Sequence, residues 1–397
     1  APTMNNDRII FMGTPEFAVG TLNALVSAGL DVAAVITAPD KPAGRGRQLR
    51  GSAVKERALE LNIPVLQPPK LKDPAFLEEL DQINASLYVV VAFRMLPEVV
   101  WNRPEYGTVN LHASLLPDYR GAAPINWAVI NGERTTGVTT FKIQHAIDTG
   151  DILLQAPLEI GPDETAGELH DRMMVIGATL MVRTVHDLFN GTAIAGPQVL
   201  PVDREPRVAP KIGPERTRIH FNGTARSVHD LVRGMSPFPG AWCHWQSEGT
   251  TSHFKVLRTR MTNTSCTEEP GTVRILEGVM QIACSDKWIE AMEVQAEGKR
   301  RMNAKEFVHG LRTIHGISLL SIYVHFDMGP AKISAELPLT QRLVSSKRAV
   351  SKNLAGGGIQ RQLSTKRPVY QHSDPFTPET LDRRAFPNTF VPESTNN

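Results

Sequence analysis

The sequence has few cysteines and no long apolar run. Its three cysteines, Cys243, Cys266 and Cys284, show no CxxC spacing, which argues against a zinc ribbon and provides no disulfide framework. No apolar run approaches the roughly 18 residues of a membrane span. The N-terminus also lacks a basic segment followed by an apolar stretch. We therefore expect a reduced, cytoplasmic protein with no metal site, no signal peptide and no membrane contact.

Length and charge indicate more than one domain. A chain of 397 residues, 41% apolar and 21% charged, is too long for one ordinary soluble domain. Residues 1–200 hold 16 basic and 22 acidic side chains, whereas residues 201–397 hold 27 and 19. An acidic first half joined to a basic second half indicates a polyanionic partner for the second. A chance imbalance of solvated surface is the alternative.

Short apolar strands alternate with helices through the first 189 residues. The expected strands are 8–12, 32–37, 65–66, 87–92, 106–111, 137–144 and 152–158. The expected helices are 17–28, 52–61, 73–82, 122–131 and 165–188, with Ser52 as an N-cap. This alternation is typical of an α/β domain whose mainly parallel sheet is covered on both faces.

The rest of the chain divides into three segments. Residues 190–214 are rich in glycine and proline and are predicted to be a linker. Residues 215–316 contain short β-like runs and one helix at 227–234, which predicts a small β-barrel domain. Residues 317–397 form a tail of unknown role whose serine, glycine and proline content predicts little packing. Within the tail, 317–326 is apolar enough to be a last strand.

The first turn lacks the glycines of a dinucleotide-binding loop. Residues 13–18 read GTPEFA, so the second and third glycines of GxGxxG are missing. Pro15 also removes a backbone N–H that such a loop would offer to phosphate. A nicotinamide-dependent oxidoreductase is therefore disfavoured, and Pro15 is interpreted as a helix-starting residue.

The loop at 37–55 is basic and contains several glycines. Its cations are Lys41, Arg45, Arg47, Arg50 and Lys55. Guanidinium and ammonium groups separated by flexible glycine suit contact with a phosphate backbone. A solvated surface loop is the alternative interpretation.

The stretch 110–151 carries the candidate chemistry. Asn110 and His112 share one face of a strand, because strand side chains alternate with period two. They stand at its carboxyl end, where open α/β sheets bind ligands. A turn at 148–151 adds the carboxylate of Asp148, while Asp151 is expected to fix the turn. Amide, imidazole and carboxylate suit acyl transfer through a tetrahedral oxyanion; a buried polar pair beside a plain turn is the alternative.

Several longer motifs resemble those of the methionyl-tRNA formyltransferase family. In the first domain they are FMGTPEFAV (11–19), TAPDKPAGRGR (37–47), VVVAFRMLP (89–97), NLHASLLPDYRGAAPINWAV (110–129) and GVTTFKIQHAIDTGDIL (137–153). In the second domain they are FPGAW (238–242) and PGTV (270–273). The resemblance extends from about residue 8 to 316; the tail has no counterpart in it.

This resemblance implies a Rossmann-like domain that binds 10-formyltetrahydrofolate and an OB-like barrel that helps to hold initiator methionyl-tRNA. By motif position, Asn110, His112 and Asp148 are the implied catalytic residues. The implied folate-binding residues are Phe93, Arg94, Met95, Leu96, Ser114, Leu115, Leu116, Pro117 and Gln144. The implied tRNA-binding residues are Lys41, Arg45 and Arg47. No metal is implied, and we expect a monomer.

Two other functions fit part of the pattern. A formyltransferase for a small amine, such as glycinamide ribonucleotide or a sugar nucleotide, would share Asn110, His112 and Asp148 but would not need the basic loop and basic barrel. A non-catalytic RNA-binding module would not need the three polar residues. Formyl transfer to methionyl-tRNA accounts for both sets of features.

Overall fold

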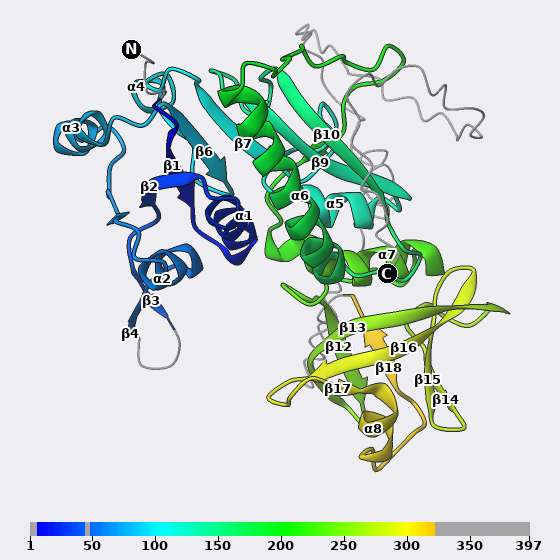
Figure 1. The fold of residues 1–397 in the computed structure, drawn as a ribbon. Helices are drawn as coiled ribbons and strands as arrows, with labels where there is room; N and C mark the ends of the chain where they lie inside the picture. Colours follow the sequence, from blue (N-terminus) through cyan, green and yellow to red (C-terminus); the bar gives the residue numbers. More distant parts are fainter. Residues whose placement is uncertain (1–5, 44–47, 322–397) are drawn as a thin grey trace, which may run out of the picture. The chain divides into compact units, whose positions relative to one another are not determined.

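The computed structural model describes residues 6–43 and 48–321 (Figure 1). The first domain is built on a seven-stranded sheet in the order β10-β9-β7-β6-β1-β2-β5. Its strands are β1 Arg8–Gly13, β2 Asp31–Ile36, β5 Val65–Leu66, β6 Leu87–Val91, β7 Thr108–His112, β9 Thr135–Lys142 and β10 Ile152–Glu159. The five strands from β7 to β5 run parallel, whereas β9 is antiparallel to both β7 and β10. The expected mainly parallel sheet is confirmed.

Helices cover both faces of this sheet. On one face pack α1 Glu16–Ser27, α2 Ala53–Glu60, α5 Pro124–Ile130 and α6 Ala166–Phe189, and on the other α3 Pro74–Ile83 and α4 Glu98–Trp101. Successive side chains of β1 point to opposite faces of the sheet and so belong to two hydrophobic cores. Ile9 and Phe11 lie in the core under the first set of helices, and Ile10 and Met12 lie in the core under the second. Ser52 caps α2 as predicted, accepting from the Lys55 backbone N–H at 3.0 Å.

The second domain is a curled antiparallel sheet. Its order is β14-β15-β16-β13-β12-β18, and β17 pairs with β16. Its elements are η1 Pro214–Thr217, α7 Ala225–Met235, β12 Ala241–Ser247, β13 Thr250–Ser265, β14 Val273–Leu276, β15 Val279–Ala283, β16 Lys287–Ala296, β17 Met302–Asn303, α8 Ala304–His309 and β18 Ser318–Leu320.

The two ends of this sheet meet at Gly271. The Leu319 N–H donates to the Gly271 carbonyl at 2.7 Å, and the Val273 N–H donates to the Ile317 carbonyl at 3.1 Å. Gly271 has φ +92°, and a Cβ there would lie 2.2 Å from the Leu319 oxygen. Glycine is therefore required where the strands curl into a half-barrel, in agreement with the expected OB-like domain.

Two boundaries differ from the prediction. The second domain was expected to end at 316, but Ile317 and Leu319, each 2% exposed, belong to its core, so β18 extends it to 320. The predicted linker 190–214 contains β11 Val208–Ala209, which pairs with β8 Arg120–Gly121 of the first domain. Proline-rich composition indicates an extended backbone but does not reveal whether that backbone pairs.

Short elements without a hydrophobic period were missed. They are α4, α8 and the hairpin of β3 Lys41–Ala43 and β4 Gln48–Arg50. Each has too few residues for periodicity to identify it. Across 6–43 and 48–321, none of the helices has the length and apolar character needed to cross a membrane.

Candidate active site

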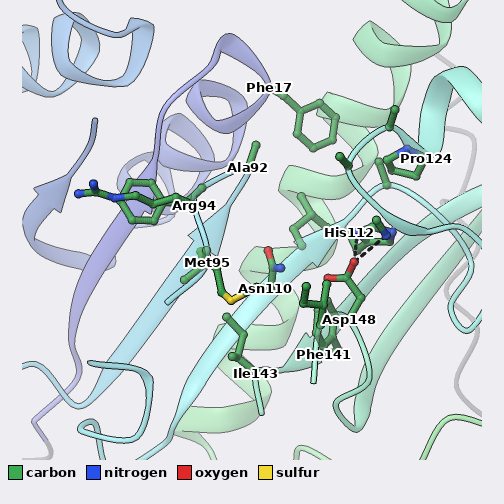
Figure 2. Close-up of a pocket in the computed structure, with 18 of the residues that line it drawn as sticks. Phe17, Ala92, Arg94, Met95, Asn110, His112, Pro124, Phe141, Ile143 and Asp148 are labelled. Atoms are coloured by element: carbon green, nitrogen blue, oxygen red, sulfur yellow. Dashed lines mark hydrogen bonds and ion pairs between the residues drawn. The ribbon is translucent and has the colours of Figure 1, made fainter. Parts of the chain in front are cut away.

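A cavity of about 700 Å³ opens at the carboxyl ends of β1, β6 and β7 (Figure 2). This is the edge of the sheet where ligands are expected in an open α/β fold. The cavity is bordered by Asn110, His112 and Asp148, so the structure brings the three predicted catalytic residues together. Its other borders are the loop after β6, residues 121–126, residues 143–147 and the start of α1.

Asn110 presents a side-chain oxygen that none of the described residues binds. Strand β7 runs between β6 and β9, which hold Asn110 beside Val90 and Phe141. The Asn110 Oδ1 atom is buried and has no hydrogen-bond partner among the described residues. Buried polar atoms are normally paired, and an exception calls for an explanation. A side-chain amide at a cavity wall, with its oxygen unpaired among the described residues, is suited to bind a ligand.

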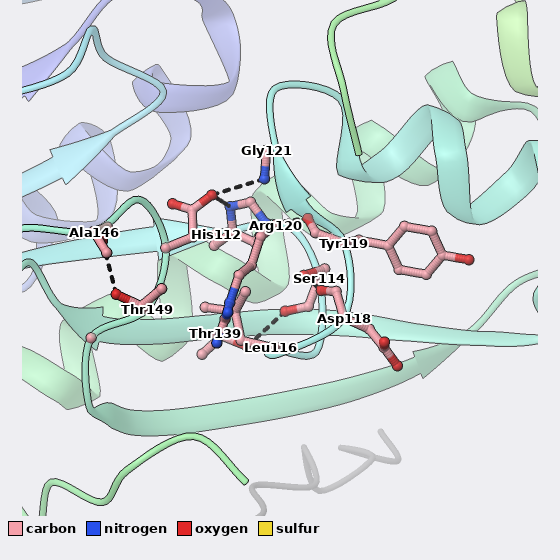
Figure 3. A network of polar contacts seen from close by, with 12 residues as sticks. His112, Ser114, Leu116, Asp118, Tyr119, Arg120, Gly121, Thr139, Ala146 and Thr149 are labelled. Atoms are coloured by element: carbon pink, nitrogen blue, oxygen red, sulfur yellow. Dashed lines mark hydrogen bonds and ion pairs between the residues drawn. The ribbon is translucent and has the colours of Figure 1, made fainter. Parts of the chain in front are cut away.

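The backbone of Tyr119 fixes the tautomer of His112 (Figure 3). The His112 Nε2 atom lies 2.8 Å from the Tyr119 carbonyl oxygen. Because a carbonyl can only accept, Nε2 must carry a hydrogen and donate it. The other ring nitrogen, Nδ1, lies 3.8 Å from Asp148 Oδ2, and these side chains are 8% and 12% exposed. Nδ1 is thus the nitrogen that faces the cavity.

Tyr119 is itself held firmly. It has φ +61°, and its N–H donates to the Arg207 carbonyl at 2.6 Å. Its hydroxyl donates to Glu133 Oε1 at 2.5 Å. Burial, followed by this bond to Glu133, raises the pKa of the Tyr119 phenol well above its usual value. The phenol therefore stays neutral and anchors the carbonyl that orients His112.

Asp148 lies in a tight turn with left-handed backbone, φ +54°. Its Oδ2 accepts from the Gly121 N–H at 2.9 Å. Two residues later the chain touches β9 so closely that a Cβ on Gly150 would lie 1.6 Å from the Lys142 oxygen. The Lys142 N–H donates to the Asp151 carbonyl at 2.9 Å, so the backbone of Asp151 fixes the end of the turn.

Five of the predicted folate residues border the cavity: Phe93, Arg94, Met95, Leu96 and Gln144. Met95 is 71% exposed at the rim, an unusual position for a large apolar side chain. The Arg94 guanidinium donates to the carbonyls of Pro68 and Pro69. Gln144 Nε2 donates to the Thr149 carbonyl at 2.9 Å, which ties this wall to the Asp148 turn.

The other four predicted folate residues, Ser114, Leu115, Leu116 and Pro117, do not border the cavity. Ser114 is fully buried and its Oγ donates to the Asp118 carbonyl at 2.6 Å. The Leu116 N–H donates to Thr139 Oγ1 at 3.2 Å. This turn leads from His112 to Tyr119, and Figure 3 shows Ser114 and Leu116 beside Thr139. The folate-binding role implied for this turn stays a prediction.

Of the three predicted tRNA-binding residues, the structure describes one. Lys41 is exposed on β3, whereas Arg45 and Arg47 lie outside the described residues. Lys55, at the end of the same loop, binds both oxygens of Asp40 at 2.9 and 2.8 Å. This bond with Lys55 lowers the pKa of the Asp40 carboxyl. Lys55 therefore contributes to structure at the base of the loop.

The sequence did not identify the wall opposite the predicted folate residues. Pro15, Phe17, Pro124, Ile125 and His170 border the cavity there. The Phe17 and His170 rings lie 5.2 Å apart, joining α1 to α6. Helical spacing marked Phe17 only as an apolar residue, because periodicity cannot tell a core side chain from one that also lines a cavity.

Family comparisons cover both domains. The family model described as "Formyl transferase" matches residues 7–185, and the model described as "Formyl transferase, C-terminal domain" matches residues 211–312. Among solved structures, WlaRD, a sugar 3N-formyl transferase, aligns with TM-score 0.54 and 20% identity over 75% of this chain and 100% of that chain. HypX from Aquifex aeolicus aligns with TM-score 0.52 and 16% identity over 77% and 47%. At these identities the likeness shows the fold alone.

Two curated relatives are much more similar. The methionyl-tRNA formyltransferase of Flavobacterium johnsoniae is 46% identical over 308 residues, which cover 78% of this chain and 97% of the relative. That of Bacteroides thetaiotaomicron is 46% identical over 316 residues, covering 79% and 98%. Both alignments cover nearly the whole relative. This chain therefore belongs to the methionyl-tRNA formyltransferase family.

Proposed function

We propose that this protein transfers the formyl group of 10-formyltetrahydrofolate to the α-amino group of methionyl-tRNA. The observation that carries the proposal is the cavity wall on which Asn110, His112 and Asp148 meet, in a chain that has both domains of its family. The three side chains supply the oxyanion donors and the proton acceptor that acyl transfer to an amine requires.

The reaction forms one C–N bond and breaks another. The neutral α-amine attacks the formyl carbon, and the oxygen of that group becomes an oxyanion. The bond to N10 then breaks, one amine proton is lost and N10 gains one. Asn110 Nδ2 would donate to the oxyanion, and Asp148 would accept the amine proton directly or through a water molecule.

The tautomer of His112 limits what this residue can do. Because its Nε2–H is held by the Tyr119 carbonyl, only Nδ1 can reach the oxyanion, and it donates only when it carries a proton. Asp148 Oδ2 lies 3.8 Å from this nitrogen. The carboxylate is therefore placed to orient His112.

The two walls of the cavity divide the substrates between them. Phe93, Met95 and Leu96 offer apolar surface on which the flat pterin of the donor can lie, with Gln144 beside them. Phe17 and Pro124 belong to a second wall, apart from Arg94 and Met95 (Figure 2). This leaves the second wall for the methionyl ester.

For the RNA, we propose that Lys41, Arg45 and Arg47 meet the acceptor arm of initiator methionyl-tRNA and that the basic second domain adds further phosphate contacts. Arg45→Ala should raise the KM for methionyl-tRNA much more than the KM for the formyl donor. Equal changes in both constants would count against this role. Cytoplasmic location and a monomeric state remain predictions.

The deciding experiment measures transfer of labelled formyl from 10-formyltetrahydrofolate to methionyl-tRNA by the full chain, with Asp148→Asn as control. Small amines, including an amino-sugar nucleotide and glycinamide ribonucleotide, serve as competing acceptors. We expect transfer to methionyl-tRNA, a large loss in Asp148→Asn and no transfer to the small amines. Transfer to a small amine but not to methionyl-tRNA would replace the proposed acceptor.

A further inference from the structure

The segment after α6 returns along the first domain and places Gln198 against the Asp148 turn. Ile152 of β10 and Gly196 form an antiparallel bridge, in which the two N–H groups donate to the opposite carbonyls at 2.7 and 3.0 Å. Gln198 follows two residues later and is half-buried, whereas its neighbour Val199 is 80% exposed. The bridge thus fixes the backbone just before Gln198.

The side chain of Gln198 uses its whole hydrogen-bonding capacity. Its Nε2 donates to the carbonyl oxygens of Asp148 at 2.8 Å and of Gly150 at 2.9 Å. Its Oε1 accepts from Arg120 Nε at 3.2 Å and from Arg120 Nη2 at 2.6 Å. Two donors and two acceptor positions are all that a carboxamide has. A side chain bonded at every position has a fixed orientation.

These bonds act on the residue whose carboxylate meets His112. Asp148 has a left-handed backbone, a conformation that is unfavourable for a residue with a Cβ and needs support from its surroundings. Gln198 holds its carbonyl, while the Gly121 N–H holds its Oδ2. Arg120, which Gln198 also binds, directly precedes Gly121 in the chain. One amide therefore joins the two segments that together orient the Asp148 carboxylate.

We infer that Gln198 is a positioning residue for the transfer reaction and acts through Asp148. This inference rests on the proposed function of Asp148. The bonds hold the carboxylate in place, 3.8 Å from His112 Nδ1. Displacement by about 1 Å can cost on the order of a hundredfold in rate. Gln198 is not among the residues that border the cavity, so we expect its loss to lower kcat and to leave both KM values in place.

Gln198→Glu is the decisive variant. Glutamate keeps the size of the side chain and can still accept from Arg120, but it has no N–H to donate to the two carbonyls. We expect kcat to fall about tenfold to a hundredfold, with both KM values within about twofold and the melting temperature little changed. Gln198→Ala should lose a similar factor. Val199→Ala, at the exposed neighbouring position, should keep wild-type kcat.

Arg120→Ala tests the hydrogen bonds of the Gln198 oxygen apart from those of the Gln198 nitrogen. It leaves both carbonyl bonds intact, so its loss of kcat should be smaller than that of Gln198→Glu. A Gln198→Glu variant with wild-type kcat, or one whose loss appears as raised KM values, would overturn the inference. So would an Arg120→Ala variant that loses as much as Gln198→Glu, because the role would then run through the guanidinium.

A second measurement tests the path through Asp148. With enzyme in excess, single-turnover rates are compared for Asp148→Asn and for Asp148→Asn combined with Gln198→Glu. If Gln198 acts through Asp148, the second substitution adds little once the carboxylate is gone. If the double variant instead lost rate by the product of the two single losses, Gln198 would not act through Asp148. If the wild type formylates a different amine, the proposed acceptor fails, and the same comparison on that amine still decides the role of Gln198.

Discussion

Replacing Asn110 with alanine should lower activity while leaving the fold as stable or more stable. The Asn110 amide is the oxyanion donor in the proposed reaction, yet its Oδ1 is buried with no hydrogen-bond partner among the described residues. One atom of the side chain therefore serves the reaction while the other opposes folding. Asn110→Ala removes both at once, so the two effects can be measured in the same variant.

The magnitudes follow from these two roles. Loss of one oxyanion donor typically costs about 2.7–4 kcal/mol, which is a factor of about 10² to 10³ in kcat. An unpaired buried acceptor costs about 1–3 kcal/mol of folding free energy. Asn110 borders an open cavity, so its truncation leaves little new void inside the core. We therefore expect the free energy of unfolding to be unchanged or to rise by about 1 kcal/mol.

The assay pairs formyl-transfer kinetics with equilibrium unfolding in urea. Thr21→Val is the matched control, because Thr21 Oγ1 is also buried without a partner among the described residues, and Thr21 does not border the cavity. The control should gain stability by a similar amount and keep wild-type kcat. A stability loss of several kcal/mol in Asn110→Ala, or a kcat close to that of the wild type, would refute the reasoning.

Three further predictions concern the turn, the second domain and the basic loop. Gly150→Ala should lower kcat at least tenfold, because a Cβ would lie 1.6 Å from the Lys142 oxygen and the Asp148 turn must shift. Burial lowers the pKa of His229, so the unfolded chain binds a proton that the folded chain does not as pH falls through about 6.5. The melting temperature should therefore drop between about pH 7.5 and 5.5, and less steeply in His229→Gln; identical slopes would contradict this. Lys41→Ala should weaken methionyl-tRNA binding and lower its salt slope by about one, which titration at several salt concentrations measures.

The parts of the site that the sequence predicted are those governed by local periodicity. Alternation along β7 places Asn110 and His112 on one face, and the parallel sheet brings their strand end to the ligand edge. The shared face and the position of the strand end both follow from the pattern of residues along single strands. The position of Asp148 needed family resemblance as well, because a turn sequence does not say which strand end it faces.

The supporting contacts could not be predicted, because they join residues far apart in the chain. Gln198 lies 50 residues from Asp148, in a segment whose prolines indicated only a linker. Tyr119 acts through its carbonyl, an atom that every residue has, so its identity gives no signal. The motif predicted Ser114 as a folate residue, but it gave no sign that the Ser114 side chain is buried and donates to the Asp118 carbonyl.

These contacts also change where the catalytic domain ends. Dividing the chain at 189 keeps every proposed catalytic side chain in the first domain but removes the atoms that orient them. The Arg207 carbonyl accepts from the Tyr119 N–H, and the Tyr119 carbonyl fixes the tautomer of His112. Gln198 Nε2 donates to the Asp148 carbonyl. Residues 190–209 thus contribute hydrogen bonds to the proposed active site, through Gln198 and Arg207. A boundary drawn from composition separates the reacting groups from the backbone and side-chain contacts that give those groups their chemistry.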